Sequence, residues 1–308
     1  MENIARPPVP AVMIGDPAAA LLRDVFGLPE LFAGLPRITS RIVSWGEQAP
    51  ASDIPHSAVV LSEQDLLREL PAPEAALPDS KPDFTVITGG PPPAGVASER
   101  FGSRSAMAVR VGLRGPRHID SCCIESLPGG WLFLIPAPTG LTWLIAIGEP
   151  LGTLLPASQV IAPRIDVQEI VKGEFSTCPR IAQPLCGPDW LLCGSAALAF
   201  DPICGDGTAQ AVREAILAAA VIRGIAAGGD SAALLAHYQT RLLAGMQKHL
   251  ALCHPYYETG GSGAWWQAEA ASLTEGFRWC AAKLRNAPEP RYLLRGFDLT
   301  ERDPLTIN

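Results

Sequence analysis

The segment at residues 194–223, GSAALAFDPICGDGTAQAVREAILAAAVIR, constrains the fold of this chain more than any other. A small-residue turn, the Asp201-Pro202 step and the loop at 205–207 lead directly into a long Ala-rich helix. This order places free backbone N–H groups at a helix N-terminus, where the helix macrodipole favours an anion. Gly205 and Gly207 lack the side chains that would hold a ligand away. The segment therefore predicts a cradle for an anionic ligand.

Composition narrows the class of protein. With 308 residues, 48% of them hydrophobic, the chain can bury a large core in one domain or two. A net charge of −7 without a cluster of Lys and Arg argues against a nucleic-acid partner. The most apolar helix expected, 209–227, carries Arg213, Glu214 and Arg223, which a bilayer would penalise. Because the N-terminus also lacks the pattern of a signal peptide, we expect a cytoplasmic protein that does not enter a membrane.

The eight cysteines predict reduced thiols rather than a metal site or disulfides. Their spacings contain no C-x-x-C pair, and most of them lie among apolar neighbours. The adjacent Cys253 and His254 lack a third ligand nearby in the sequence. We therefore expect no metal. His249 and His254 are expected to pack in the core.

The order of elements predicts a mixed α/β protein. Strands are expected at 41–45 and 57–61, and a helix follows, with Ser62 as its N-cap. Residues 106–147 contain four strand-like runs separated by turns, which predict an antiparallel sheet. Three helices follow, at 208–226, 230–253 and 264–285, and the tail after Asn286 is expected to be irregular. No clear linker divides the chain. We therefore expect a core at 1–226 with the sheet interwoven in it, and a helical region at 227–308.

Two motifs place this order of elements beside a known family. The run GWLFLIP at 130–136 resembles the G-W-x-W-x-I-P signature of flavin-dependent tryptophan halogenases, with Phe133 in place of the second Trp. The segment GSAALAFDPICGDGT resembles the G-D-A and D-P-x-x-G-x-G motif that these enzymes share with FAD-dependent monooxygenases. Residues 11–27 are similar to the I-G-E-x-T segment of the same family. Together these likenesses cover about residues 11–253.

The resemblance implies an incomplete FAD-binding Rossmann-like layer, an antiparallel substrate-domain sheet and C-terminal helices. It implies FAD as the cofactor, with its pyrophosphate at the start of helix 208–226. The strand residues Trp131 and Phe133, which share one face, and Pro136 would line a substrate tunnel, although the same face could equally be ordinary sheet core. Carried over position by position, the resemblance implies that these residues line the flavin: Gly194, Ser195, Asp201, Pro202, Gly205, Asp206, Gly207 and Thr208.

Three departures from the family pattern refine the expectation. Ser195 stands where the family has Asp, and a hydroxyl binds ribose less strongly than a carboxylate does. No G-x-G-x-x-G precedes residue 194, so the chain begins after the first nucleotide-binding unit of the family. The halogenases use a lysine in the first third of the chain, whereas the first lysine here is Lys81 in a Pro-rich loop. The missing lysine favours hydroxylation over halogenation, because a hydroxylase needs no such residue.

Two functions from different classes follow. The first is an FAD-dependent monooxygenase acting on an aromatic, tryptophan-like compound or on a protein-borne aromatic side chain, with a flavin reductase as a candidate partner. The second is an N-terminally truncated or degenerate homologue that binds a partner without flavin. His56, at a strand entry, is a candidate for a catalytic base, with a structural role as the alternative. The pairs Tyr256-Tyr257 and Trp265-Trp266 could cover a planar substrate or pack between two helices. An uncovered sheet edge would favour a homodimer.

Overall fold

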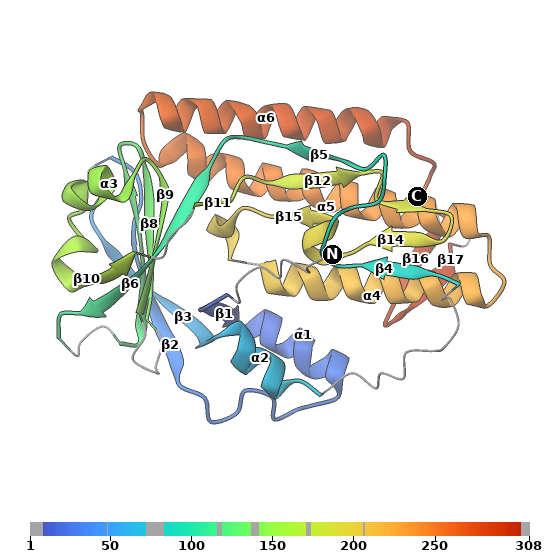
Figure 1. The fold of residues 1–308 in the computed structure, drawn as a ribbon, viewed down its shortest axis with the longest axis horizontal. Coiled ribbons are helices and arrows are strands. Elements are labelled where there is room, and N and C mark those ends of the chain that lie inside the picture. The colour runs from blue at the N-terminus through green and yellow to red at the C-terminus, as the bar shows by residue number, and fades with distance from the viewer. Residues whose placement is uncertain are drawn as a thin grey trace.

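A computed structural model describes residues 9–47, 49–71, 83–115, 119–136, 142–170, 174–205 and 207–302. A large sheet forms one end of the molecule and three long helices extend from it, flanked by two small sheets (Figure 1). The expected mixed α/β class is confirmed.

The large sheet contains nine strands, and its centre is the antiparallel sheet expected at 106–147. Four strands of that region pair in the order β7-β8-β9-β6, all antiparallel. Strand β2 extends the sheet by parallel pairing with β7. In spatial order the strands are β1 (Val12–Gly15), β3 (Ser52–Leu61), β2 (Arg37–Ser44), β7 (Ser121–Leu127), β8 (Gly130–Ile135), β9 (Thr142–Gly148), β6 (Ser105–Leu113) and β10 (Ile165–Ile170), with β11 (Phe175–Ser176) also paired to β6.

Alternation along β8 gives this sheet two apolar faces. Trp131 and Phe133 belong to the main hydrophobic cluster, on the side of the long helices. Leu132 and Leu134 belong to a second cluster on the opposite face, which α3 (Leu151–Ala157) covers. Since successive side chains of a strand point to opposite faces, both faces of this run must be covered, and all six residues of β8 are buried. The prediction that Trp131 and Phe133 share a face is confirmed.

Two small sheets lie along the long helices. One of them contains β4 (Thr85–Ile87), which pairs in parallel with β14 (Trp190–Leu192), and β14 also pairs with β13 (Cys186–Gly187). The other joins β5 (Ala97–Arg100), β12 (Arg180–Gln183) and β15 (Leu198–Ala199). The parallel pair matters most here, because its strands end beside the segment that predicts the cradle.

The three long helices are α4 (Gly207–Ala226), α5 (Ser231–Thr259) and α6 (Ala264–Arg285). Asp230 caps α5 by accepting the backbone N–H of Ala233 at 3.0 Å. The indole N–H of Trp266 donates to the carbonyl of Leu127 at 2.8 Å and thus attaches α6 to the large sheet. Residues from β8, α4, α5 and α6 share one hydrophobic cluster, so the helices after residue 227 pack on the same core as the strands before them.

Most of the predicted elements are confirmed, and two details are wrong. Helix α1 (Asp16–Phe26) ends at Gly27 in the left-handed conformation, and α2 (Glu63–Glu69) is capped by Ser62. The expected irregular tail instead contains a hairpin of β16 (Tyr292–Arg295) and β17 (Asp298–Glu301), whose backbones pair in register. The spacing of Trp266, Leu273, Phe277 and Cys280 along α6 predicts one buried stripe, but Phe277 is 40% exposed. Among the helices of the described residues, we find none with the length and apolarity to cross a membrane.

Candidate functional site

The parallel strands β4 and β14 bring two loops to the same edge of their sheet. The backbone N–H of Cys193 donates to the carbonyl of Ile87 at 2.9 Å. Just beyond the two strands, the hydroxyl of Ser195 donates to the carbonyl of Thr88 at 3.3 Å. Ligands of open α/β sheets bind outside the carboxyl ends of such strands. This edge is therefore the expected place for a cofactor, and Ser195 is exposed on it.

The Asp-Pro segment turns the chain from β15 toward α4. The Asp201 side chain accepts the backbone N–H of Ile203 at 3.0 Å and so caps a 3-10 turn at Pro202–Cys204. Gly205 closes this turn at φ 61°, a left-handed conformation that few other residues adopt. Helix α4 begins at Gly207, with Thr208 in its first turn, while the predicted cofactor residue Asp206 lies outside the described residues.

The glycines predicted to contact flavin border open space. A Cβ atom built at Gly194, Gly205 or Gly207 would meet no atom within 4 Å. Gly194 is left-handed at φ 58° as well, so the turn itself requires glycine there. A flat ligand could therefore approach the backbone at all three positions. These three glycines and the start of α4 are called the glycine cradle below.

A buried carboxyl group connects the two halves of the cradle. Glu214, on the second turn of α4, accepts the backbone N–H of Gly194 at 3.0 Å. Gln210 donates to its other oxygen at 3.1 Å. Burial raises the pKa of Glu214 to about 7, although both hydrogen bonds work in the opposite direction. The carboxyl thus holds the end of β14 against α4, and it gains a proton near neutral pH.

The Asp201 side chain points into the core and not toward the cradle. The carboxylate is fully buried and forms an ion pair with Arg104, with 2.9 Å between Oδ2 and Nε. The hydroxyl of Tyr257 donates to the same oxygen at 2.9 Å. Arg104 forms a second buried ion pair with Glu269 on α6. The carboxylate of Asp201 is committed to this network, so only the backbone of Asp201 is left to face a ligand.

The strand motif is connected to the same network. The Trp131 indole N–H lies 3.4 Å from the Tyr257 hydroxyl and donates to it. Trp131 is completely buried and also makes an edge-to-face contact with Trp45. Phe133 belongs to the same hydrophobic cluster, and Ile203 and Cys204 of the 3-10 turn pack against that cluster. Pro136 follows β8 and is buried. Trp131 therefore has the packing of a core residue.

His56 lies on β3 and contacts Arg41 of β2. The Arg41 guanidinium donates to His56 Nε2 at 3.0 Å, and its Cζ atom lies 6.0 Å from the Phe133 ring. Burial and then the charge of Arg41 lower the pKa of His56. The imidazole is therefore neutral at neutral pH, and the lone pair of Nε2 is occupied. The structural role weighed for His56 agrees with this geometry.

The aromatic pairs on α5 and α6 pack against one another. Tyr257 lies 5.6 Å from Trp266 and 6.0 Å from Trp265 between ring centroids, and Trp45 inserts against Trp266 at 5.6 Å. These contacts correspond to the expected packing at a helix connection. His254 differs from expectation, because it is partly exposed and pairs with Glu258 at 3.3 Å.

Three contributors to this site escaped prediction. Arg104 stands just before a strand, and nothing in its sequence neighbourhood marks it as the centre of a buried charge network. The sequence marks Glu214 only as a helix residue, and His249, which is buried as expected, also accepts the backbone N–H of Asp201 at 2.7 Å. A carboxylate inside an apolar Ala-rich helix was the one available signal for Glu214.

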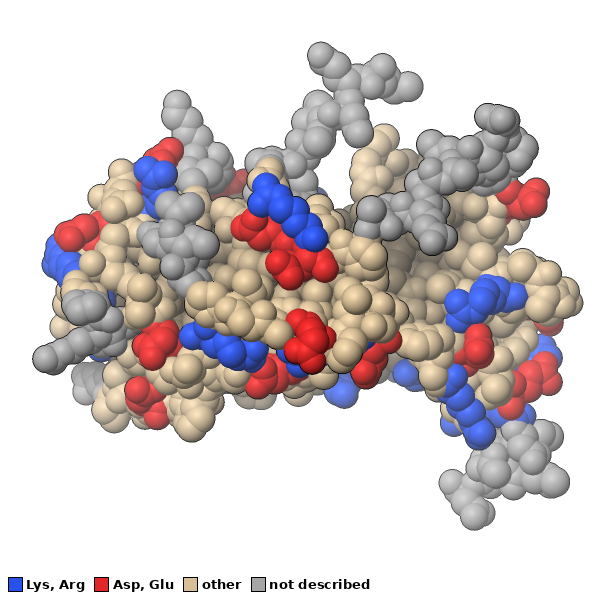
Figure 2. Space-filling view, turned by 90° about the horizontal axis from the view of Figure 1, so that it is seen from below, with Lys and Arg blue, Asp and Glu red and all other residues tan. Residues whose placement is uncertain are grey.

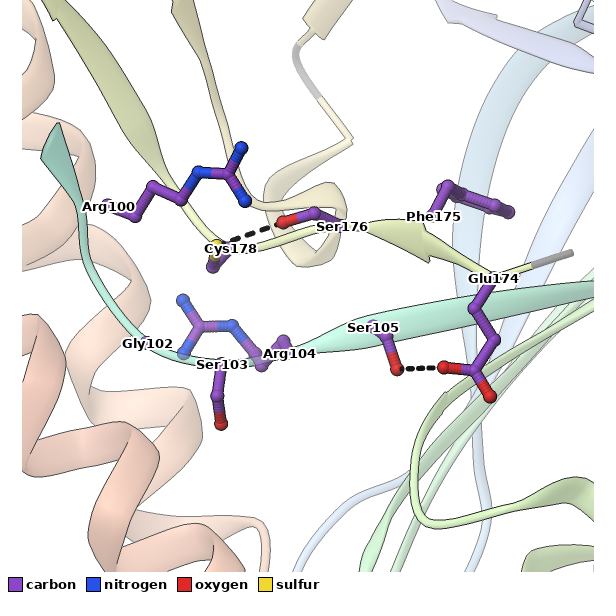
Figure 3. Close-up of a pocket in the computed structure, with 9 residues that line it drawn as sticks. All are labelled: Arg100, Gly102, Ser103, Arg104, Ser105, Glu174, Phe175, Ser176 and Cys178. Atoms are coloured by element: carbon purple, nitrogen blue, oxygen red, sulfur yellow. Dashed lines mark hydrogen bonds between the residues drawn. The ribbon is translucent and has the colours of Figure 1, made fainter. Parts of the chain in front are cut away.

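A pocket of about 200 Å³ lies on the other side of Arg104. Figure 3 shows the Arg100 and Arg104 guanidinium groups near Cys178. At the other end of the pocket, the hydroxyl of Ser105 donates a hydrogen bond to Glu174. Arg104 is already paired with Asp201 and Glu269, so Arg100 is the lining residue whose positive charge could contact a ligand in this pocket. Over the face seen in Figure 2, acidic and basic side chains are interspersed.

Comparison with known proteins identifies the fold. Neither a protein-family model nor a curated protein matches the sequence. Among solved structures, the peptidyl tryptophan dihydroxylase QhpG, essential for tryptophylquinone cofactor biogenesis, has a TM-score of 0.64 at 17% identity, covering 98% of this chain and 79% of its own. The p-nitrophenol 4-monooxygenase PnpA from Pseudomonas putida has a TM-score of 0.62 at 16% identity, covering 92% and 89%. The flavin-dependent halogenase CmlS has a TM-score of 0.61 at 17% identity, covering 88% and 63%.

These similarities confirm the expected resemblance at the level of fold. The chain has the architecture found in flavin-dependent halogenases and aromatic monooxygenases. The motifs at 130–136 and 194–208, from which that architecture was predicted, lie on β8 and on the approach to α4.

Proposed function

We propose that this protein is an FAD-dependent monooxygenase that hydroxylates an aromatic substrate. The observation that carries the proposal is the glycine cradle, because Gly194, Gly205 and Gly207 leave open space at the carboxyl edge of β4 and β14. The cradle lies in a fold shared with a tryptophan dihydroxylase and a nitrophenol monooxygenase. A side chain at any of the three positions would fill the space that a planar cofactor needs.

The roles of the residues follow from their positions. The backbone N–H groups at the start of α4 would donate to anionic groups of FAD, and Ser195 would contact its sugar chain. Reduced FAD supplies the activation of dioxygen for transfer to an electron-rich ring. Pro202 and the rest of the 3-10 turn, which pack on the same cluster as Phe133, would form one wall of the site. The Arg104, Asp201 and Tyr257 network connects this turn to β8 through Trp131.

Tryptophan, free or within a protein, is the substrate that we favour. The dihydroxylase of the same fold acts on a peptidyl tryptophan, as its name states. We prefer hydroxylation to halogenation because the first lysine of the chain, Lys81, lies in a Pro-rich loop beyond the region that matches the lysine-bearing part of the halogenases. We also propose a flavin reductase as the source of reduced flavin.

Isotope labelling tests this proposal. The intact chain is supplied with FAD, NADH, a flavin reductase and a tryptophan-containing peptide under ¹⁸O₂, with bromide present. We expect a product that carries one or two oxygen atoms from ¹⁸O₂ and no bromine. A Gly207→Trp variant should lose the product, whereas Gly152→Trp, which also points into open space but on α3, should keep it. A brominated product, or hydrogen peroxide without any modified peptide, would contradict hydroxylation.

We further propose that two copies associate through the exposed strand β10. This strand is an edge of the large sheet, and its side chains Val167 and Ile170 are 44% and 52% exposed. An uncovered edge with apolar side chains favours pairing with another chain. Light scattering should give the mass of a dimer, and a monomer at micromolar concentration would refute this association.

A further inference from the structure

Two cysteines and a histidine meet behind the 3-10 turn, in a cluster that the proposed oxygenation does not use. Cys204 ends the turn at Pro202–Cys204, while His249 and Cys253 lie one helical turn apart on α5. The Sγ atoms of Cys204 and Cys253 are 3.4 Å apart. His249 Nε2 lies 3.4 Å from the Cys253 sulfur. All eight cysteines are free thiols.

The two thiols differ in exposure and acidity. Cys253 is completely buried, whereas Cys204 is only partly buried. The hydrogen bond from the Cys253 thiol, together with His249, lowers the pKa of Cys204 to about 6. The same hydrogen bond and burial raise the pKa of Cys253. Cys204 is therefore the thiolate and nucleophile of the pair, and Cys253 is the protonated partner.

His249 favours a dithiol over a metal centre. Its ring stacks on Phe200 with centroids 3.9 Å apart and an angle of 3°, which fixes its orientation. Its Nε2 atom, the nitrogen nearer to the Cys253 sulfur, already accepts the backbone N–H of Asp201 at 2.7 Å. A metal ion would need this lone pair, and binding would break a short buried hydrogen bond.

We propose that Cys204 and Cys253 are a peroxide-sensitive dithiol that closes to a disulfide between the 3-10 turn and α5. The Cys204 thiolate attacks hydrogen peroxide and breaks its O–O bond, which yields a sulfenic acid and, with one proton, water. The Cys253 sulfur then attacks the Cys204 sulfur. The S–O bond breaks, the thiol proton leaves with hydroxide as a second water, and the S–S bond forms. Two electrons pass from the two thiols to one peroxide.

Closure of this bond would fix the segment that forms the proposed flavin site. The disulfide would join residues 49 positions apart, and Gly205 follows Cys204 directly. This consequence depends on the proposed function, whereas formation of the disulfide does not. Peptide mapping without any flavin therefore separates a failure of the dithiol from a failure of the monooxygenase.

The test is thiol mapping of the reduced, intact chain during treatment with hydrogen peroxide. Free thiols are blocked with N-ethylmaleimide at intervals and the peptides are identified by mass spectrometry. We expect a Cys204–Cys253 disulfide to form at least ten times faster than oxidation at any other cysteine. In Cys253→Ser, Cys204 should still react and be captured by dimedone as the sulfenic acid. In Cys204→Ser, the fast reaction should be absent, and Cys280→Ser, at another buried thiol, should behave as the unmodified chain does.

Three results would overturn the dithiol. The first is oxidation of Cys204 no faster than that of buried Cys280. The second is a disulfide that links a different pair of cysteines. The third is one equivalent of zinc retained by the purified chain and required for its thiols to stay protected from peroxide, since that would assign the cluster to a metal.

Discussion

Replacing Glu214 by Gln should abolish a pH dependence of stability that a single buried carboxyl creates. The pKa of Glu214 rises from an ordinary 4.5 to about 7 because α4 and its neighbours bury the group. A carboxyl whose pKa is higher in the folded state binds its proton more tightly there than in the unfolded chain. Its contribution to stability is therefore fully present below about pH 4.5, and it is lost as the pH rises through about 7.

The magnitude follows from the pKa difference. A change from 4.5 to about 7 corresponds to a total of about 3 kcal/mol in the free energy of unfolding, at about 1.4 kcal/mol per pKa unit. About 2.5 kcal/mol of it falls between pH 5 and pH 8. A Gln side chain can still accept the N–H of Gly194 through its amide oxygen, and it carries no titrating group. The variant should therefore keep the cradle and lose the pH dependence.

The assay is urea unfolding followed by tryptophan fluorescence at pH 5 and pH 8. Other groups titrate in this range, so the informative quantity is the difference between Glu214→Gln and the unmodified chain. That difference should shift by about 2.5 kcal/mol in favour of the variant between the two pH values. Gln267→Glu, which adds a carboxyl at an exposed position on α6, serves as the control. A constant difference between Glu214→Gln and the unmodified chain at both pH values would refute the reasoning.

Two further substitutions test the packing around the site. Arg104→Met should lower the free energy of unfolding by about 3–5 kcal/mol, because it leaves the buried Asp201 and Glu269 carboxylates unpaired. Arg110→Met, which breaks an exposed pair with Glu169, should cost less than about 1 kcal/mol, and equal losses in urea unfolding would contradict the burial argument. Ser62→Ala should cost about 1 kcal/mol by removing the cap of α2, measured in the same assay. Ser272→Ala, an exposed helix position on α6, should be nearly neutral, and a cap variant as stable as this control would refute the role of Ser62.

Local patterns predicted the elements of the fold well. The four strand-like runs of 106–147 pair as one antiparallel sheet, because alternation on β8 requires two covered faces. The Gly-rich turn before α4 was predicted from residues that only a sharp turn and a close approach explain. Both patterns depend only on residues that are close together in the sequence, so they can be recognised without knowing which distant segments come into contact.

Long-range partners could not be predicted. The parallel pairing of β4 with β14 joins residues about a hundred positions apart, and no local pattern specifies it. The inward orientation of Asp201 depends on Arg104, which is contributed by the start of a different sheet. Cys204 and Cys253 meet only because α5 passes behind the 3-10 turn, and the histidine beside them is His249, one helical turn before Cys253, and not the adjacent His254.

The central claim is that the glycine cradle at the start of α4 holds FAD, and direct titration tests it. Flavin fluorescence is followed while FAD is mixed with the intact chain, Gly207→Trp and Gly152→Trp. The account predicts one FAD per chain for the intact protein and for Gly152→Trp, with affinity at least tenfold weaker in Gly207→Trp. No binding by the intact chain, or equal affinity in all three proteins, would contradict the claim.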